Sequence, residues 1–593
     1  ADNRTTKLLD LFTEKSITKD LIKLFEYPAP NFKRASLDIE VLNENKKVPR
    51  SEIANYPVVC VCIKTTDGKR IAFLLIQPNK SFDKYPDVDE LYTFSDEKEL
   101  LLELFKYIQQ FPFLITFNGD GFDLTYLRNR AYRFGIQNDY IPFIPSGDAT
   151  FMRGTIHIDL YRFFQITAIK NYAFQGKYKE ASLDTISKLF LKKGKFNEDK
   201  RSISEMDYYT LVNYCMRDAD LTLELTTFDD NLVINLMTAV SRISRMPIEE
   251  CSRKAVGKWI ASFLFYQHRQ LSYLIPNPID ILTLKGHTTS KSIVKGKQYE
   301  GAMVIKPKGG IPFGVQDIDY GSLYPSVIKF YNLGYSTINC KHPECQSNKF
   351  AGLPHWICTK HDALESIFIG ALRDLRLSWY KKQSKNKDLT NSQKSWYKCV
   401  EQIIKVFMNA SYGVFAAEQG FAFGCPPVSE EIAGISRTII QATAKQASDM
   451  GIEVIYGDTD SLFIKKTDKI GELQKWAFDQ YKIDLELDKE YRFMCFSSRK
   501  KNYIGVQLNG DIDIKGMTGK KSHTPTYFKN AFNEIKVILK NVQKEEDIPD
   551  AKIKIKKIAL TSYKNLKSRK WNSIDDLAFH MTVNKKLSEY GAK

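Results

Sequence analysis

Residues 36–42 read SLDIEVL, an apolar run that carries two acids, Asp38 and Glu40. The alternation predicts a β-strand. Residues two apart in a strand lie on the same face, so both carboxylates share one face and the apolar side chains share the other. Two like charges on a buried strand are costly unless a cation lies between them. Taken alone, this pair of acids is more typical of an exposed strand.

Strand and helix patterns alternate around this segment. Strand patterns occupy residues 36–42, 58–64, 71–77 and 113–118, and helical patterns occupy residues 97–110 and 208–228. This alternation predicts an α/β domain over residues 33–230. A mainly helical connector is expected over residues 231–300.

Two further segments add acids to the first pair. In FNGDGFDLTYL (117–127), Asp123 opens a helix directly after an apolar strand. In YCMRDADLT (214–222), Tyr214 and Asp218 are four residues apart and share one helical face. We expect Asn118 to be a supporting polar contact. Asp120 and Asp220 are off this pattern and are expected to be ordinary surface acids.

A second set of acids lies after residue 300. In QDIDYGSLYPSVI (316–328), Asp319 ends an apolar strand. In VIYGDTDSLFI (454–464), two apolar strand halves enclose Asp458 and Asp460 in a short turn, where acids can meet a metal without burial in a sheet. The alternative is a turn that uses Asp for its backbone geometry.

A helical stripe accompanies the second set. In KVFMNASYG (405–413), Lys405, Asn409 and Tyr412 fall at i, i+4 and i+7, and the helix is expected to end at Gly413. A cation, an amide and an aromatic ring are unusual together on a core face. Such a stripe suits a nucleotide, because the cation can bind phosphate and the ring can lie against a base.

The rest of the chain beyond residue 300 is expected to alternate in the same way. The patterns predict a strand over residues 314–319, a helical zone from about 363 to 450, and a strand hairpin over 453–465. The polar run 381–395 is interpreted as the tip of a helical hairpin. From about residue 500 the chain is Lys-rich and is expected to be mostly helical.

Composition and charge limit the function classes. The chain has 593 residues, 43% hydrophobic and 26% charged, with a formal net charge of +17. The length predicts several domains, and the basic excess suits a polyanionic partner as well as plain solubility. With no membrane-length apolar run and only ten cysteines, we expect a soluble, intracellular protein rather than a disulfide scaffold.

The first set of acids resembles the DEDD exonuclease of proofreading DNA polymerases, which has an RNase H-like fold. The resemblance implies that two divalent metals, Mg²⁺ with Mn²⁺ as a substitute, are held by Asp38, Glu40, Asp123 and Asp218. Tyr214 would orient the attacking water. Two such cations about 3.5–4 Å apart stabilise both the attacking and the leaving oxygen of a displacement.

The second set resembles the motifs DxxSLYPS and YGDTDS of the B family of DNA polymerases, whose fold is a right hand of palm, fingers and thumb. The match implies that Asp319 and Asp460 are the polymerase metal ligands. Asp458 would be a secondary acid, and Asp317 is expected not to be a ligand because its spacing to SLYPS is wrong. The helical stripe resembles the family motif KxxxNSxYG, with Ala410 where the family has Ser.

By the same resemblance, further residues take roles in binding. The nucleotide contacts implied are Tyr324, Arg376, Lys405, Asn409 and Tyr412. The DNA contacts implied are Tyr299, Gly301, Lys500, Lys501, Tyr503, Lys520 and Lys521. In the family, the tyrosine of SLYPS packs beneath the sugar and excludes a 2′-hydroxyl, so Tyr324 is expected to select deoxyribonucleotides.

The family pattern also predicts how the chain divides. The expected divisions are an N-terminal remnant (1–32), the exonuclease domain (33–230), a helical connector (231–300), the first palm segment (301–362), fingers (363–420), the second palm segment (421–498) and a partial thumb (499–593). Relative to the family, the N-terminal domain and the thumb are expected to be truncated. The wording of DIKGMTGKKSHTP (513–525) favours an archaeal replicative type.

The resemblance implies a DNA-directed DNA polymerase with 3′–5′ proofreading activity, acting in DNA replication and in repair. Its expected partners are primer-template DNA and dNTPs, in a cytoplasmic, nucleoid-associated location and without a membrane. A sliding clamp is a further candidate partner, although no clamp-binding motif is visible. Two alternatives are a nuclease whose second half only grips DNA and an inactive scaffold, and the intact acids argue against both.

A group of cysteines and a histidine remains outside these motifs. Cys340 and Cys345 are separated by four residues, and Cys358 and His361 by two. These spacings are compatible with structural Zn²⁺. A disulfide, as in heat-loving archaeal relatives, and ordinary unlinked cysteines are the other two interpretations.

Overall fold

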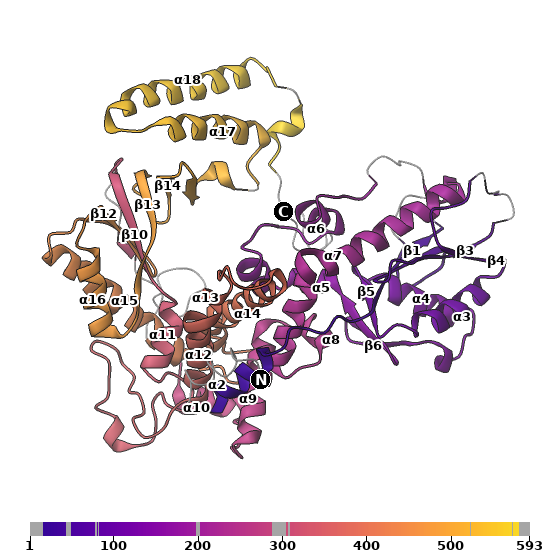
Figure 1. Cartoon of the computed structure of the whole chain (residues 1–593), viewed down its shortest axis with the longest axis horizontal. Helices are drawn as coiled ribbons and strands as arrows, with labels where there is room; N and C mark the ends of the chain where they lie inside the picture. The colour runs from indigo at the N-terminus through magenta and orange to yellow at the C-terminus, as the bar shows by residue number, and fades with distance from the viewer. Residues whose placement is uncertain are drawn as a thin grey trace, which may run out of the picture. The chain divides into compact units, whose positions relative to one another are not determined.

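The computed structural model consists of two compact units (Figure 1). The first comprises residues 1–287, 332–345 and 358–429, and the second comprises residues 288–331, 346–357 and 430–593. Within them, the structure describes residues 16–42, 49–77, 80, 82, 84–196, 202–287, 304–305, 309–521, 523–571 and 573–579. The mixed α/β multidomain fold that the patterns predict is confirmed.

The first unit is built on a six-stranded sheet in the order β4-β3-β2-β1-β5-β8. Strands β1, β2 and β3 pair antiparallel, whereas β5 and β8 run parallel to β1. The strands are β1 (Arg34–Val41), β2 (Val58–Thr65), β3 (Arg70–Leu75), β4 (Glu90–Phe94), β5 (Phe113–Thr116) and β8 (Ile156–Asp159). All four strands predicted here are present, and each observed end lies within two residues of the predicted one.

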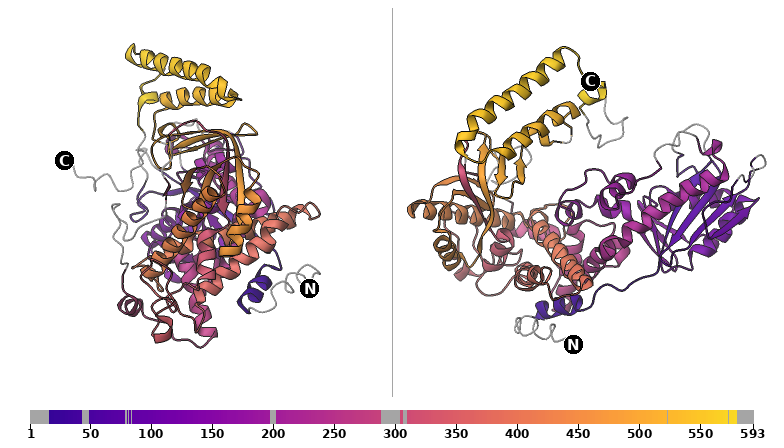
Figure 2. Two further views of the ribbon diagram at one scale, coloured as in Figure 1. Left: turned by 90° about the vertical axis from the view of Figure 1, so that its left-hand side faces the viewer. Right: turned by 45° about the horizontal axis from the view of Figure 1, so that its top comes forward.

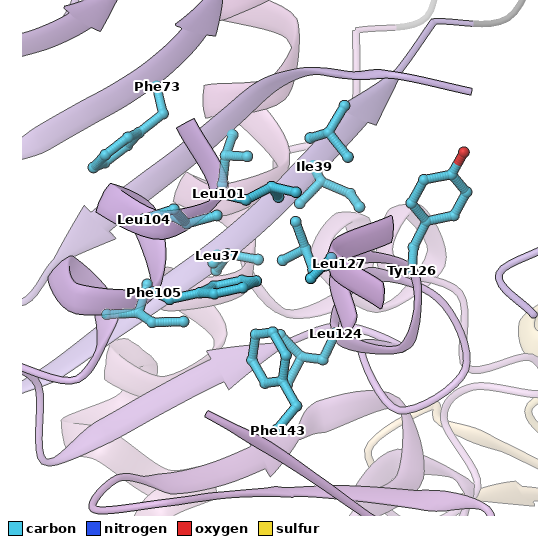
Figure 3. Packing of buried hydrophobic residues seen from close by; sticks show 14 of the residues in the cluster. Leu37, Ile39, Phe73, Leu101, Leu104, Phe105, Leu124, Tyr126, Leu127 and Phe143 are labelled. Atoms are coloured by element: carbon cyan, nitrogen blue, oxygen red, sulfur yellow. The ribbon is translucent and has the colours of Figure 1, made fainter. Parts of the chain in front are cut away.

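Helices cover both faces of this sheet. On one face, Leu37 and Ile39 of β1 pack in one core cluster with α3 (Glu97–Ile108) and α4 (Asp123–Arg133) (Figure 3). On the other face, α7 (Tyr208–Ser244) packs on β2 and β3. Because strand residues alternate, Asp38 and Glu40 face the α7 side. The period-2 prediction for β1 is therefore confirmed, and burial of each large apolar side chain contributes about 1.5–3 kcal/mol.

Helix α7 is interrupted where the predicted helix ends. Phe228, Asp229, Asp230 and Asn231 have non-helical backbone angles, and the last three are left-handed. The Arg34 guanidinium donates a hydrogen bond of 2.7 Å to the Asn231 side chain, which ties the break to the start of β1. The 208–228 prediction thus describes the first of two helical pieces.

Further helices complete the first unit. In α2 (Ser16–Phe25), the Phe25 carbonyl accepts a 3.0 Å hydrogen bond from the Trp396 indole, so the described portion of the expected remnant is integrated into this unit. The predicted helical hairpin has a shorter tip, because α13 (Lys381–Gln383) continues one arm and a capping box at Thr390 starts the other. The remaining elements are β6 (Phe143–Ser146), β7 (Ala149–Met152), α5 (Leu160–Gln165), α6 (Leu183–Phe190), α8 (Ile248–Cys251), α9 (Val256–Gln270), α10 (Pro278–Lys285), α12 (Leu364–Leu375) and α14 (Asn391–Phe415).

The second unit is built on a seven-stranded sheet in the order β15-β14-β13-β10-β12-β11-β9. The strands are β9 (Val304–Ile305), β10 (Phe313–Tyr320), β11 (Val454–Asp458), β12 (Ser461–Lys465), β13 (Leu485–Phe496), β14 (Tyr503–Gln507) and β15 (Ile512–Lys515). The predicted strand 314–319 and hairpin 453–465 are confirmed. The expectation of a mostly helical chain from residue 500 is wrong for β14 and β15, because β14 pairs with β13 and β15 pairs with β14.

Helices also flank the second sheet. They are α11 (Leu323–Phe330), α15 (Pro426–Asp449), α16 (Ile470–Tyr481), α17 (Thr526–Asn541) and α18 (Ile548–Lys567). The last two lie side by side, in yellow in Figure 2, and share a core cluster with β13 and β14. Among the described residues, no helix combines the length and the apolar character needed to cross a membrane.

One acid that was expected at the surface is instead buried. Asp120 is 4% exposed, and the Arg253 guanidinium donates hydrogen bonds of 2.8 and 3.0 Å to its carboxylate. Burial alone would raise the pKa of Asp120, but the bonds from Arg253 and the nearby His157 hold it below its usual value. Asp220 is half-buried and pairs with Arg70 at 3.0 Å. The surface prediction for Asp120 is therefore wrong, because its partner is 133 residues away.

Replacing Arg253 by Leu should lower the stability of the first unit by about 3–5 kcal/mol, because it leaves the Asp120 carboxylate buried without its counter-ion. The matched control is Arg162→Leu. Arg162 approaches the same carboxylate at 3.7 Å but is 27% exposed, so its loss should cost less than about 1 kcal/mol. Urea denaturation followed by circular dichroism compares the two variants. Equal losses would contradict the importance assigned to the Arg253 pair.

Candidate active sites

Four carboxylates, including that of Asp38 in β1, come together in the first unit. Asp38 and Glu40 come from β1, Asp123 begins α4, and Asp218 comes from α7. Burial raises the pKa of Asp38 well above its usual value, and the charges of Asp218, Asp123 and Glu40 raise it further. The pKa of Glu40 is raised in the same way, by burial and then by Asp218, and that of Asp123 is raised to about 7, chiefly by burial. The structure therefore brings together the four acids that the sequence singles out.

Specific hydrogen bonds dock α7 onto β1 and position its polar residues. The Ser36 hydroxyl donates to the carbonyl of Ala219 at 2.7 Å, and the Cys215 thiol donates to the carbonyl of Asp38 at 3.3 Å. Tyr214 lies one turn before Asp218 and is half-buried. Burial raises the pKa of its phenol, and Glu40 and Asp218 raise it further, so Tyr214 also faces the acid cluster.

A lysine that the sequence analysis missed completes this cluster. The Lys195 ammonium contacts the Asp218 carboxylate directly. Burial lowers the pKa of Lys195, but the charge of Asp218 outweighs that effect and holds it above its usual value. Lys195 lies in the run LKKGK (191–195), where nothing in the spacing distinguishes it from its neighbours. The fold, and not the sequence pattern, shows that Lys195 rather than Lys192 or Lys193 contacts the acids.

Asn118 supports the cluster through its backbone. It adopts a left-handed conformation with φ of 76°, and its N–H donates a 2.8 Å hydrogen bond to the Asp159 carboxylate. Asp159 also accepts from the N–H of Asp120 at 3.1 Å. Burial raises the pKa of Asp159 to about 6, and its charge in turn raises the pKa of Asp123. The buried carboxylate of Asp159 thus holds the loop that precedes α4 through two backbone N–H groups.

A second group of carboxylates lies within the second unit. In the strand register, Asp319 of β10 and Asp458 of β11 both pair with Ser461 of β12, and Asp460 lies in the turn between β11 and β12. Burial raises the pKa of Asp319 to about 8, and Asp460 and Asp317 add to the shift. Asp460 is exposed, but its surroundings remove part of its hydration. This partial loss of hydration and the charge of Asp458 raise its pKa as well.

Three oxygens in this group are buried without a hydrogen-bond partner among the described residues: Asp317 Oδ1, Asp319 Oδ1 and Asp458 Oδ2. Lys515 lies 3.6 Å from the last of these, so Asp317 Oδ1 and Asp319 Oδ1 are the two that best fit a hard cation. Buried polar atoms without partners are costly, and oxygen-only donor sets are those that Mg²⁺ and Mn²⁺ prefer. Burial raises the pKa of Asp317 to about 7. Its exclusion from the ligand set therefore stays a prediction that rests on its spacing.

Two lysines neutralise Asp458, one from the turn before β14 and one from the end of β15. Lys501 Nζ lies 2.9 Å from one carboxylate oxygen, and Lys515 Nζ lies 3.6 Å from the other. The Lys501 N–H also donates to the Tyr456 hydroxyl at 3.0 Å. Asp458 is thereby paired with two cations, and its secondary role stays a prediction.

The nucleotide-contact candidates belong to both units. Tyr324 is half-buried in the first turn of α11 in the second unit. In the first unit, Lys405, Asn409 and Tyr412 lie on the accessible side of α14, opposite its buried apolar residues. The predicted stripe is therefore present. Its helix does not end at Gly413, however, but continues to Phe415.

Arg376 lies next to this stripe. Its guanidinium donates to the Glu401 carboxylate at 2.8 Å, and Glu401 precedes Lys405 by one turn of α14. The pair is largely buried, with 12% and 18% of the two side chains exposed. Arg376 is thus held beside the Lys405 position, and its expected contact with phosphate stays a prediction.

The expected DNA contacts differ in exposure. Lys500, Lys501, Lys520 and Lys521 are exposed. Tyr503 is 7% exposed, and its ring packs against Phe463 at a centroid distance of 5.4 Å. Its role at DNA stays a prediction, because most of the ring is covered. Tyr299 and Gly301 lie outside the described residues.

Comparison with known proteins places this architecture in a family. Residues 248–593 match DNA polymerase family B, and residues 9–179 match the exonuclease domain of DNA polymerase family B. The first match covers more than half of the chain. The chain therefore belongs to DNA polymerase family B, which confirms the family that the motifs predict.

Individual relatives agree with this placement. The chain is 40% identical to DNA polymerase 1 of Sulfolobus acidocaldarius, over 97% of this chain and 66% of the relative. It is 35% identical to DNA polymerase 1 of Aeropyrum pernix, over 99% of this chain and 62% of the relative. The chain thus spans 62–66% of the length of these two relatives.

A solved structure shares the fold. The family B DNA polymerase from the hyperthermophilic archaeon Pyrobaculum calidifontis superposes with a TM-score of 0.61 at 24% identity, covering 95% of this chain and 69% of that one. At this identity the likeness concerns the fold alone.

Binding of Mn²⁺ to the first acid cluster should tighten between about pH 6 and about pH 8, because the metal must displace protons from carboxyls with raised pKa values. Asp123, with a pKa of about 7, should contribute about tenfold over this range. Calorimetry on an Asp319→Asn/Asp460→Asn variant isolates this cluster from the second one. Glu40→Gln in that background is the control and should abolish binding. Tighter binding at about pH 6 would contradict the prediction.

Proposed function

We propose that this chain extends a DNA primer along a template by adding deoxyribonucleotides, and removes nucleotides from the primer 3′ end at a second site. The observation that carries this proposal is that each unit has its own cluster of converging carboxylates with raised pKa values. One cluster suffices for a nuclease. Two clusters on a family B chain fit synthesis and proofreading together.

Mg²⁺ is the proposed metal at both sites, with Mn²⁺ as a substitute, because all the donors are carboxylate oxygens. At the polymerase site, Asp319 and Asp460 would hold it, with Asp458 alongside. When bound, such metals lower the pKa of an attacking hydroxyl and neutralise charge on the leaving group. The protein's own contribution is to hold these acids close together and partly dehydrated before substrate arrives.

The nucleotide would be bound by side chains of the α14 stripe. Lys405 supplies a cation for the triphosphate, and Tyr412 supplies a ring for the base. Arg376, which Glu401 now holds, offers a second cation. Tyr324 is proposed to lie beneath the deoxyribose and to exclude a 2′-hydroxyl.

Hydrolysis would use the cluster of the first unit. Asp38, Glu40, Asp123 and Asp218 are the proposed metal ligands, and the Tyr214 hydroxyl would orient the attacking water. Lys195, whose ammonium contacts Asp218, is the cation in position to neutralise the cleaved phosphate. One site would then form the phosphodiester with release of pyrophosphate, and the other would break it with water and release a nucleotide.

Primer-template DNA and dNTPs are the proposed substrates, and replication, with a contribution to repair, is the proposed process. The exposed Lys500, Lys520 and Lys521 are proposed to contact the DNA backbone, where cations position a duplex without reading its sequence. A protein with this substrate would work at the host's nucleoid. A sliding clamp would be an additional partner.

Single substitutions should separate the two activities. Asp460→Asn should reduce primer extension by more than about 100-fold, because loss of a direct ligand should cost more than loss of its supporting contacts. It should leave degradation of the primer 3′ end unchanged. Asp38→Ala should have the reverse effect. Both activities are measured on a labelled primer-template with Mg²⁺, with and without dNTPs.

The parent chain serves as the positive control for both assays. No extension by the parent chain would refute the polymerase proposal. Undiminished degradation by the Asp38→Ala variant would refute the assignment of the exonuclease site.

Tyr324→Ala should relax sugar selection, because removal of the ring opens space for a 2′-hydroxyl. The expected result is a large rise in ribonucleotide incorporation, with deoxyribonucleotide incorporation reduced much less. Tyr324→Phe is the matched control, since it keeps the ring and should keep the discrimination. Single-nucleotide incorporation with dNTP and rNTP measures the ratio, and an unchanged ratio in the Ala variant would remove Tyr324 from this role.

A further inference from the structure

Four potential metal ligands converge in the first unit, and none of them belongs to either acid cluster. Cys340, His342, Cys345 and Cys358 each offer one ligand atom, and these four atoms all lie within 4.8 Å of one another. The three cysteines are buried, with 4%, 0% and 2% of their surface exposed, and His342 is half-buried. None of the ten cysteines of the chain forms a disulfide in this structure.

The sulfur atoms of this cluster accept hydrogen bonds from the backbone. The N–H of Thr359 donates to Cys345 Sγ, and the N–H of Lys360 donates to Cys358 Sγ, both at 3.4 Å. A neutral thiol is a weak acceptor, whereas a thiolate is a strong one and is the form that binds metals. Two backbone donors aimed at two sulfurs therefore favour thiolates at these positions.

A second group of cysteines in the same unit has the opposite hydrogen bonding. Cys60, Cys62 and Cys215 are fully buried in the apolar core between the sheet and α7. There the Cys62 and Cys215 thiols donate to backbone carbonyls, at 3.5 and 3.3 Å. Such sulfurs behave as protonated core residues. Proximity of cysteines alone thus does not make a metal site, and the direction of the hydrogen bonds distinguishes the two groups.

We propose that Cys340, His342, Cys345 and Cys358 bind one structural Zn²⁺ in a tetrahedral Cys₃His site. Zinc bonds of about 2.3 Å to sulfur and 2.0–2.1 Å to nitrogen put neighbouring ligand atoms about 3.5–3.8 Å apart, which small movements of this cluster reach. All four positions are filled by the protein, as in structural zinc sites rather than catalytic ones.

The structure selects His342 over His361, the histidine that the Cys-x2-His spacing suggests. His361 is not part of the converging group. Its Nδ1 lies 3.3 Å from Cys358 Sγ, within hydrogen-bond distance of that ligand. We assign it a supporting role beside the zinc site, which orients Cys358 without binding the metal.

The surroundings of the cluster suit a metal with three thiolates. Such a site has an excess of negative charge, and Lys285 lies close by, with its ammonium bound to the carbonyls of Ile338 and Asn339 at 2.8 and 3.3 Å. The Asn332 side chain holds the other loop by donating to the carbonyls of Cys358 and His361, at 3.3 and 2.8 Å. The zinc would join these two loops, which polar contacts already bring together.

The test is the metal content of the whole chain, purified without added metal or chelator and dialysed extensively. Mass spectrometry of the metal should find about one zinc per chain. Cys345→Ser and His342→Ala should each lower the zinc content by about tenfold or more. The matched control is Cys251→Ser, a buried cysteine outside the cluster, which should retain the zinc. His361→Ala removes only a supporting contact and should retain more zinc than His342→Ala.

Thiol titration of the denatured parent chain separates the alternatives. An absence of zinc would overturn the proposal, whether ten thiols titrate, which indicates ordinary cysteines, or fewer, which indicates a disulfide. Loss of zinc from His361→Ala with retention in His342→Ala would overturn the ligand assignment. Because ligand variants can fail to fold, the folded parent chain is also loaded with Co²⁺. Tetrahedral absorption bands with thiolate charge transfer support the site, and their absence refutes it.

Discussion

Repulsion between carboxylates that share a partly dehydrated site is the constraint on which both halves of this molecule depend. In the first unit β1 brings Asp38 and Glu40 against Asp218, and in the second the β10–β12 register brings Asp319 beside Asp458 and Asp460. Each arrangement is unfavourable without cations, and the pKa values of Glu40 and Asp319 are raised as a result. The apolar cores on either side hold the strands in place against this repulsion.

In the two units, lysines offset the repulsion between carboxylates in different ways. In the first, Lys195 from a loop is the lysine that approaches the acids among the described residues. In the second, Lys501 and Lys515 pair with Asp458, the secondary acid, whereas Asp319 has no cationic partner among the described residues. Lysine pairing therefore reaches a proposed metal ligand, Asp218, in the first unit and only the secondary acid in the second.

Local pattern predicts those features of the fold and the sites that depend on neighbours in sequence. The faces of β1 follow from period two, and the α14 stripe follows from the helical repeat. Lys195, the burial of Asp120 and strands β14 and β15 do not follow, because each depends on a partner brought from elsewhere in the chain. The same limit applies to the cysteine cluster, where spacing points to His361 and the fold converges on His342.

The break in α7 has a mechanical consequence. The helix carries Tyr214 and Asp218 in its first piece and runs on toward the connector in its second, with three consecutive left-handed residues between them. If α7 were one continuous helix of 37 residues, it would transmit any rotation or shift of its C-terminal end directly to Tyr214 and Asp218. The interruption breaks the helix axis, and the hydrogen bond from Arg34 to Asn231 holds the break against β1. A shift of the second piece is therefore not transmitted along one continuous helix axis to Tyr214 and Asp218.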